Sequence, residues 1–323
     1  MMENRGTRQW FWGVLRLQGS VIPGIWPRVL VCGLFGELIA ILYDRGYPVS
    51  HPSFDKIVPS IVLGLLLVFR TNTAYDRFWE GRKIWGGIIN TSRNLARQIW
   101  VFVNARTPAE VAQKQQVLQL VTAFTYTTKD HLRRQPPTAT VAEVVTPAQF
   151  QTLQVVQHPP LEVMFWVNDY LHQQHERGNL NTHQMVSIVS LIDLQVNHLG
   201  SCERILKTPL PLAYTIHLRQ LLLFYCLALP IQWVETLGFL TGGVTALISF
   251  TLLGIEEIGL EIENPFGCDP NDLPLDAMCD GVRQHVNELI TLNPQDVQLS
   301  FGDPIAAPRS GSFSPLAPEP EQV

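Results

Sequence analysis

Histidines recur in one polar stretch of the chain at a spacing that metal sites use. His172 and His175 stand three residues apart in YLHQQHERG, and His183 and His198 follow them. Residues at i and i+3 share one face of a helix, and imidazole nitrogens are common zinc ligands. A polar, solvated helix face accounts for the same residues, and we favour this interpretation. The sequence therefore predicts neither a metal site nor a cofactor.

A second group of titratable side chains follows the last long apolar run. It consists of Glu256, Glu257, Glu261 and Glu263. Di-iron bundles need Glu-x-x-His pairs, which this stretch lacks, so we interpret these groups as solvated or helix-capping carboxylates. The GxSxG, Walker and HExxH motifs are also missing from the sequence. We therefore predict that the protein is not an enzyme.

Ile61, Leu65 and Phe69 form an apolar stripe, which we call the 61–69 stripe. Their spacing of i, i+4 and i+8 places them on one helix face over about 12 Å, at 1.5 Å of rise per residue. Ser60 and Gly64 would let a neighbouring helix approach closely. Such a stripe is usually core packing, but around an axis shared by several copies it forms a constriction that excludes water. Spacing alone leaves both interpretations open.

The composition indicates which elements hold this stripe. Only 16% of the 323 residues are charged and 46% are hydrophobic, whereas soluble proteins carry about 25% charged residues. The chain is therefore expected to contact lipid. Its net charge of −5 offers no basic surface for nucleic acid. The five cysteines form no CxxC pair, which argues against a disulfide scaffold or a structural zinc site.

Long apolar runs predict the membrane spans, which need about 20 residues each. Thr236–Ile255 carries no charge, Leu212–Val234 carries only Arg219, and the two are expected to join around Pro230–Glu235. Val29–Tyr43 is a further candidate with Glu37 inside it. Ile57–Phe69 is too short unless its helix continues into the polar residues that follow, and the sequence has no Gly or Pro at that junction. Four spans in two hairpins are predicted.

The remaining residues predict an all-α fold in which a polytopic membrane part carries a cytoplasmic helical domain. Helix breaks are expected near residues 178–179 and Gly200, with loops at 135–138 and 158–160. Basic residues ahead of the first span place both termini in the cytoplasm. The predicted regions are an interfacial segment (1–27), a first membrane hairpin (28–74), a cytoplasmic helical region (75–209), a second hairpin (210–255), C-terminal cytoplasmic helices (256–300) and a disordered tail (301–323).

Four separated segments carry motifs that resemble one known family. They are LQGSVIP (17–23), VLGLLLVFRTNTAYDRFWEGRKIWG (62–86), ERILKTPLPLAY (203–214) and IENPFG (262–267). Together they are similar to the bestrophin family in its bacterial and plant-type branch, over most of residues 8–290. The resemblance implies a homopentameric ion channel with one central pore, in which each subunit contributes four membrane helices and a cytoplasmic helical domain.

The resemblance also implies roles for particular residues. Ile61, Leu65 and Phe69 match the three apolar residues of the family's pore neck. Leu210, directly before Pro211, matches the residue of the narrow cytoplasmic aperture. The family signature is Asn264, Pro265, Phe266 and Gly267.

Two departures from animal bestrophins bear on function. Asp269, Asp272 and Asp276 are dispersed among prolines where animal members have an unbroken acidic run that helps to bind calcium. Calcium needs six to eight oxygen ligands, so we expect no calcium activation and interpret Asp272 or Asp276 as a helix cap. Leu65 stands where animal members have an aromatic residue, which leaves ion selectivity open.

Three function classes remain at this point. The favoured one is a bestrophin-like pentameric channel for monovalent ions. We favour anions such as chloride as the permeant ions, with a cation-selective channel of the same fold as the alternative. A transporter would need inverted repeats with broken helices, and the two predicted hairpins are not alike. A non-conducting membrane scaffold is the third. The expected partners are further copies of the chain, the lipid bilayer and permeant ions, and the expected location is a cell (inner) membrane or a thylakoid-type membrane.

Overall fold

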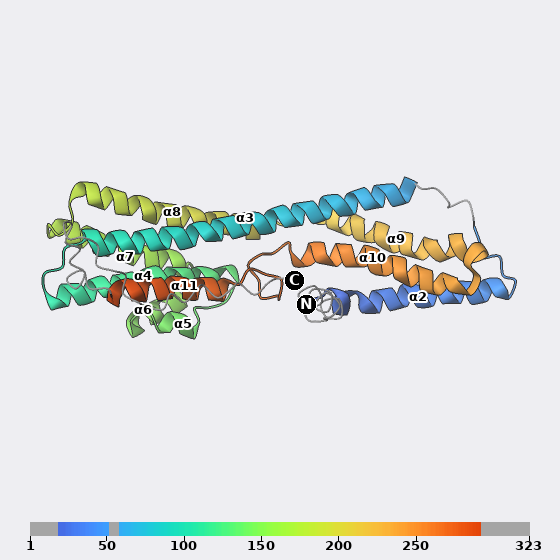
Figure 1. The fold of residues 1–323 in the computed structure, drawn as a ribbon, viewed down its shortest axis with the longest axis horizontal. Helices are drawn as coiled ribbons and strands as arrows, with labels where there is room; N and C mark the ends of the chain where they lie inside the picture. The colour runs from blue at the N-terminus through green and yellow to red at the C-terminus, as the bar shows by residue number, and fades with distance from the viewer. Residues whose placement is uncertain (1–18, 52–57, 292–323) are drawn as a thin grey trace, which may run out of the picture.

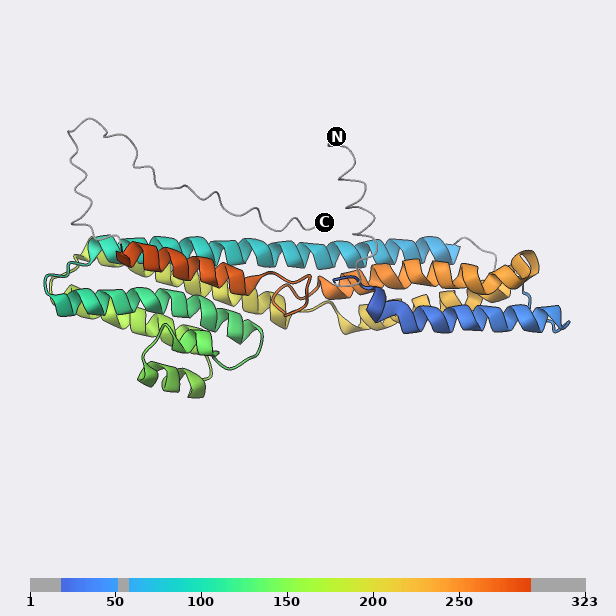
Figure 2. The ribbon, with the colours of Figure 1, turned by 60° about the horizontal axis from the view of Figure 1, so that its bottom comes forward.

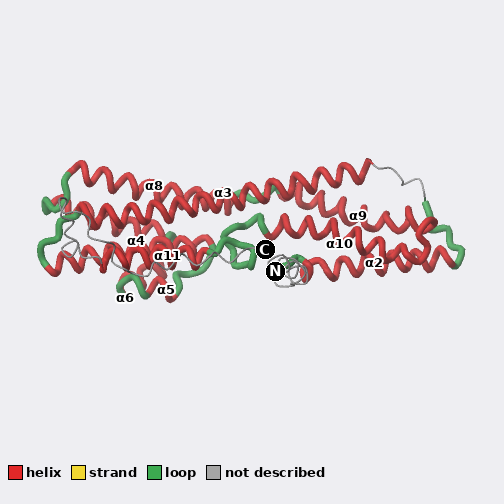
Figure 3. The backbone as a smooth tube through the Cα atoms, viewed as in Figure 1, coloured by secondary structure: helices red, strands yellow, loops and turns green. Residues whose placement is uncertain are grey.

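The computed structural model describes residues 19–51 and 58–291, in which all the regular elements are helices (Figure 3). This confirms the all-α prediction. The molecule is elongated, with α2, α9 and α10 at one end and α4 to α8 and α11 at the other (Figures 1 and 2). Among the helices of the described residues, only α3 runs through both ends. The predicted tail (301–323) and most of the predicted interfacial segment lie outside the described residues.

The apolar end contains α2 (Ile22–Asp44), α9 (Leu212–Leu237) and α10 (Thr241–Glu261). Among the described residues, Ile22–Asp44 and Leu212–Glu261 are long and apolar enough to cross a membrane. The second stretch includes both α9 and α10, which meet at the 3-10 turn Gly238–Leu240. Small residues let α2 and α10 pack closely, since a Cβ on Gly36 would lie 3.0 Å from Cα of Gly242.

The turn between α9 and α10 differs from the prediction. It was expected around Pro230–Glu235, but α9 continues through Pro230 to Leu237. Proline is tolerated inside apolar helices because neighbouring groups compensate for the missing hydrogen bond. The helix ends instead at Gly238, whose φ of +53° is a conformation that glycine adopts readily.

α3 (Val58–Phe102) is a single helix of 45 residues, which corresponds to a length of about 67 Å. Its first part is apolar and its later part is polar, so one rigid element connects the two ends of the molecule (Figure 1). The predicted continuation past Phe69 is confirmed. In the apolar part, Leu63 and Leu67 pack against Leu218 and Leu222 of α9.

The polar end is a bundle with its own core. Its helices are α4 (Pro108–Leu132), α5 (Ala139–Ala142), α6 (Pro147–Val155), α7 (Pro159–Glu176), α8 (Thr182–Lys207) and α11 (Leu275–Thr291). Side chains of α3, α4, α7, α8 and α11 form the largest buried cluster. α4 lies at its centre, with fully buried Leu118, Val121 and Phe124.

Local signals set several helix ends in this bundle. Capping boxes begin α4 at Thr107 with Glu110 and α8 at Asn181 with Gln184, each satisfying two backbone N–H groups. The break predicted near 178–179 is confirmed, since Gly178 has φ +72° between α7 and α8. The break predicted at Gly200 is wrong, because α8 runs through it. A glycine inside a helix lowers its stability by only about 1 kcal/mol relative to alanine. The buried residues of α8 offset this loss.

Candidate functional site

The 61–69 stripe lies on a face of α3 that the other described residues leave exposed. Ile61, Leu65 and Phe69 are 63%, 54% and 56% exposed, whereas Leu63 and Leu67 are 3% and 2% exposed. At 100° per residue, the stripe and the buried pair point about 180° apart. Packing within a single described chain therefore does not account for the stripe. Large exposed apolar side chains in a row mark a contact surface or a pore lining.

The stripe ends at a buried arginine. Arg70 is fully buried, and its Nη2 donates a hydrogen bond to Oε2 of Glu263 at 2.8 Å. The other carboxylate oxygen, Oε1, accepts a hydrogen bond from the backbone N–H of Leu210 at 3.0 Å. One carboxylate thus connects the base of the 61–69 stripe to the residue predicted at the aperture.

Arg77 fixes the end of the neighbouring helix. Its guanidinium donates to the backbone carbonyl oxygens of Ile205 at 2.7 Å, of Thr208 at 2.5 Å and of Glu263 at 3.2 Å. Ile205 lies in the last turn of α8, whose carbonyls lack partners within the helix, and Thr208 is the residue directly after that helix. Arg77 therefore holds the residues before Leu210, and the backbone of Glu263, to α3.

Leu210 lies in the short connection between α8 and α9, half-buried. Pro211 directly follows it as the N-cap residue of α9, and a residue before proline is biased toward an extended backbone. The hydrogen bond from its N–H to Glu263 adds a second constraint. The backbone of Leu210 is thus held at one place, as an aperture residue would require.

The signature residues 264–267 pack against α3 rather than onto the 61–69 stripe. Phe266 is fully buried with its ring centroid 6.4 Å from that of Trp85. Gly81 of α3 is required for this contact, because a Cβ there would lie 2.7 Å from Cγ of Pro265. Asn264 forms a hydrogen bond within the same turn, its Oδ1 accepting from the N–H of Phe266 at 3.4 Å. This segment anchors the 262–275 connection to the long helix.

The capping role predicted for Asp272 is wrong. Its Oδ2 accepts a hydrogen bond from the N–H of Asp269 at 2.8 Å, inside the turn that precedes α11. Close packing against Gly267 leaves no room for a side chain there, since a Cβ would lie 2.5 Å from Oδ2. Burial raises the pKa of Asp272 above its usual value. This carboxyl stabilises a turn.

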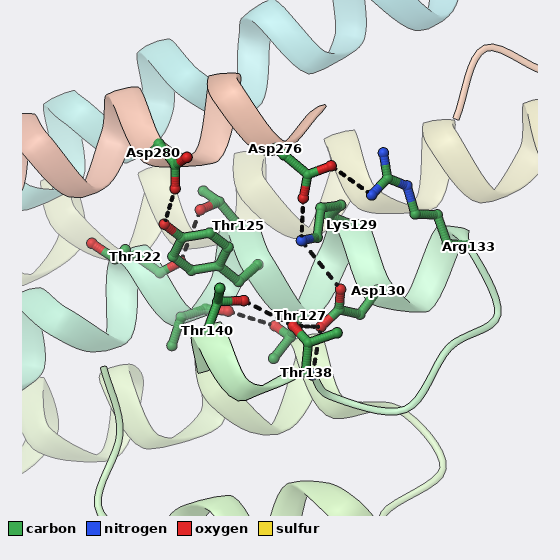
Figure 4. A network of polar contacts seen from close by, with 12 residues as sticks. Thr122, Thr125, Thr127, Lys129, Asp130, Arg133, Thr138, Thr140, Asp276 and Asp280 are labelled. Atoms are coloured by element: carbon green, nitrogen blue, oxygen red, sulfur yellow. Dashed lines mark hydrogen bonds and ion pairs between the residues drawn. The ribbon is translucent and has the colours of Figure 1, made fainter. Parts of the chain in front are cut away.

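Asp276 joins two helices instead of capping one. Its Oδ1 accepts from Lys129 Nζ at 2.6 Å and its Oδ2 from Arg133 Nη1 at 2.8 Å (Figure 4). Burial alone would raise the pKa of Asp276, but the hydrogen bonds from Lys129 and Arg133 more than offset it, so the pKa lies below its usual value. Beside this contact, Tyr126 of α4 donates to Asp280 of α11.

The prediction of solvated or helix-capping carboxylates at the end of α10 is wrong for two of the glutamates, which pair with arginines of other helices. Glu256 is 2% exposed and accepts from Arg219 Nε of α9 at 3.0 Å. Arg28 of α2 lies 3.1 Å from Glu257. Together with the Arg70–Glu263 pair, these contacts tie α2, α3 and α9 to the last turns of α10 and the residues just after it.

The histidines considered for metal binding do not come together. His172 pairs with Glu176 on its own helix at 3.3 Å, and Nδ1 of His175 lies 2.8 Å from the carbonyl oxygen of Leu180. His198 packs against Gly87 of α3. Two other histidines, His131 and His158, do converge, on Glu203.

Comparison with known proteins decides the family. The sequence profile described as bacterial/fungal bestrophin protein matches residues 1–288. The chain belongs to the bestrophin family. A voltage-dependent anion channel-forming protein of Nostoc sp. is 54% identical to this bestrophin over 287 residues, covering 89% of this chain and 94% of its own. A Synechocystis sp. protein with the same description is 50% identical over 300 residues, covering 93% and 97%.

The fold agrees with this assignment. A crystal structure of a bacterial bestrophin homologue from Klebsiella pneumoniae superposes on this bestrophin with a TM-score of 0.74 at 28% sequence identity, covering 84% of this chain and 100% of that one. The family resemblance inferred from four motifs is thereby confirmed. This bestrophin is a membrane protein of an ion-channel family, and the prediction that it is not an enzyme is also confirmed.

Sequence reasoning missed the residues that hold the segment around Leu210. The sequence analysis treats Arg70 and Arg77 only as the polar continuation of a helix, and Glu263 only as a solvated or helix-capping carboxylate. A signal was present, because Arg70 directly follows a long apolar run and Glu263 lies within the IENPFG motif. Their pairing joins residues 193 positions apart, which requires the fold.

Proposed function

We propose that this bestrophin forms a homopentameric channel with a single pore, in which each chain crosses the membrane four times. Ile61, Leu65 and Phe69 of each copy line a hydrophobic neck, and Leu210 lines a narrower cytoplasmic aperture. Both chain ends lie in the cytoplasm, in a cell (inner) or thylakoid-type membrane. The observation that carries the proposal is the exposure of the 61–69 stripe on the face of α3 opposite its contact with α9.

The proposed permeant ions are monovalent anions such as chloride. The support comes from the two cyanobacterial relatives, both described as voltage-dependent anion channel-forming proteins. A neck of apolar rings resists hydration and therefore limits flux without choosing the sign of the ion. Selectivity for anions must then arise elsewhere along the pore.

Two measurements on the purified protein test the proposal. The mass of the detergent-solubilised complex is expected to equal five chains. Reversal potentials in planar bilayers under asymmetric NaCl are expected to lie toward the chloride equilibrium potential. A monomeric mass or the absence of current would contradict the channel and favour a scaffold. Reversal toward the sodium potential would contradict the anion assignment and favour a cation channel of the same fold.

A further inference from the structure

Three side chains that the ion pathway does not use converge where three helices meet. His131 belongs to the last turn of α4, His158 is the residue preceding α7, and Glu203 lies near the end of α8. Nε2 of His131 and Nε2 of His158 lie 2.8 Å and 2.7 Å from the same oxygen, Oε1 of Glu203. The two imidazole rings are 4.4 Å apart between centroids. Donor atoms from three separate elements therefore face one point.

We propose that His131, His158 and Glu203 form a binding site for a zinc-class divalent cation that links α4, α7 and α8. Two imidazole nitrogens and one carboxylate oxygen are a ligand set that zinc uses in sites with three protein ligands and one water. These donor atoms all lie within 4.8 Å of one another. Copper and nickel suit the same nitrogen-rich set, whereas calcium and magnesium prefer oxygen ligands alone.

To hold the ion, both imidazole nitrogens must move away from the carboxylate oxygen of Glu203. Zinc–nitrogen and zinc–oxygen bonds of about 2.0–2.2 Å in a tetrahedron separate neighbouring donors by about 3.3 Å. The present separations of 2.7 and 2.8 Å must therefore widen by about 0.5 Å. The side chains of His131 and His158 are 24% and 32% exposed, so they have room to move and the ion can reach them.

The carboxylate of Glu203 is held on both of its oxygens. Its Oε1 faces the two imidazoles, and an ion bound there would replace these two hydrogen bonds. Lys207 contacts the other oxygen, Oε2, at 2.8 Å. That contact holds the carboxylate for one-oxygen ligation, and the 67% exposed Lys207 side chain keeps its charge largely in solvent.

A cavity borders one of the three donors, His131, and has room for the water that would be the fourth ligand. It has a volume of about 300 Å³, is lined by His131, Asp130 and Gln154 among others, and is polar enough to hold water. The site stands apart from the 61–69 stripe, but Glu203 is only seven residues before Leu210 in the sequence. A cation held there would fix the end of α8 that leads to the proposed aperture.

The experiment uses tag-free, full-length protein in detergent, freed of metal with a chelator and titrated calorimetrically with ZnCl₂ at pH 7.5. We expect one zinc ion per chain with a micromolar or tighter Kd. His131→Gln, His158→Gln and Glu203→Gln should each weaken binding at least tenfold. The matched control His172→Gln removes an exposed histidine that pairs with Glu176 on its own helix and should bind zinc as the wild type does.

A second readout identifies the ligand geometry in the wild-type protein, independently of how any variant folds. Co²⁺ in place of Zn²⁺ should give the strong visible absorption of a four-coordinate site, and stoichiometric Zn²⁺ should abolish it. The absence of stoichiometric zinc binding in the wild type would overturn the proposal. So would octahedral cobalt spectra, or a loss of binding in His172→Gln as large as in His131→Gln.

Discussion

Leu210 derives its position from its neighbours rather than from burial of its own side chain. Pro211 restricts its backbone, and Glu263 accepts a hydrogen bond from its N–H at 3.0 Å. The side chain itself is only half-buried. Its size can therefore change without disturbing the core, which makes the proposed aperture testable with a single substitution.

Leu210→Ala should alter the permeability ratios among anions of different size, because it widens the proposed aperture. The midpoint of thermal unfolding should change little, since the side chain is only half-buried. Bi-ionic reversal potentials in planar bilayers measure the first quantity and tryptophan fluorescence the second. Leu223→Ala, a 54% exposed position within α9, is the control. Unchanged permeability ratios in Leu210→Ala would argue against an aperture at this residue.

Asp276 stabilises the bundle in a way that depends on pH. Burial would raise its pKa, but Lys129 and Arg133 lower it further than burial raises it. The native state therefore binds this proton less tightly than the unfolded chain, whose carboxyl titrates at about 3.9. The stabilisation is present above about pH 4 and is lost as the pH falls through the lower native value.

Asp276→Asn should lower the free energy of unfolding at pH 7 by about 1 kcal/mol, a modest effect because the side chain is 61% exposed. Between pH 5 and pH 3, the free energy of unfolding of the variant should also fall less than that of the wild type. Thermal unfolding measured across this pH range tests both effects. Glu176→Gln, which alters only an exposed pair with His172, should reproduce the wild-type pH dependence. An identical acid dependence in Asp276→Asn and the wild type would contradict the pairing.

At the scale of elements, α3 and the segment after α10 act as one unit around Leu210. Arg70 is fully buried and bonds to Glu263, and Arg77 binds the carbonyls that end α8. A buried charge that loses its partner is costly, by about 3–5 kcal/mol. The Arg70–Glu263 pair is therefore expected to be essential to the junction between the two ends of the molecule.

Glu263→Gln should lower the free energy of unfolding by about 3 kcal/mol, because Arg70 keeps its charge and loses the carboxylate. Glu80→Gln is the control, because Glu80 lies on α3, the helix that also carries Arg70. Glu80 meets Arg204 at 3.3 Å with both side chains well exposed, so its loss should cost less than about 1 kcal/mol. Chemical denaturation in detergent measures both values. Equal losses for the two variants would contradict the structural role of Glu263.

The elements were more predictable than their contacts. The continuity of α3 is predictable because neither Gly nor Pro stands at the junction of its apolar and polar parts, at Phe69 and Arg70. Apolar and polar residues alike can continue a helix. The turn after α9 was misplaced because Pro230 was weighted as a breaker and Gly238 was not. Periodicity selected the 61–69 stripe, but it carries no information on partners such as Glu263 or on the convergence of His131 with His158.

At the scale of the whole molecule, the polar bundle has a complete core while the apolar end leaves large side chains exposed. The fully buried cluster lies among α3, α4, α7, α8 and α11. On α3, the 61–69 stripe remains uncovered. Lipid accounts for exposed apolar surface in general. Under the proposed function, the stripe that ends at buried Arg70, beside Leu210, lines the pore instead. The assembled channel is thus expected to place this stripe on its axis.

The central claim is tested most directly by the single-channel conductance of the triple variant Ile61→Ala, Leu65→Ala and Phe69→Ala in planar bilayers. Smaller side chains widen the neck and let water enter, so the conductance or open probability should rise several-fold over the wild type. The paired control, Leu34→Ala with Leu38→Ala, trims two exposed residues at the same i, i+4 spacing on α2 and should conduct as the wild type does. A triple variant that assembles normally and conducts as the wild type does would show that the 61–69 stripe does not line the pore.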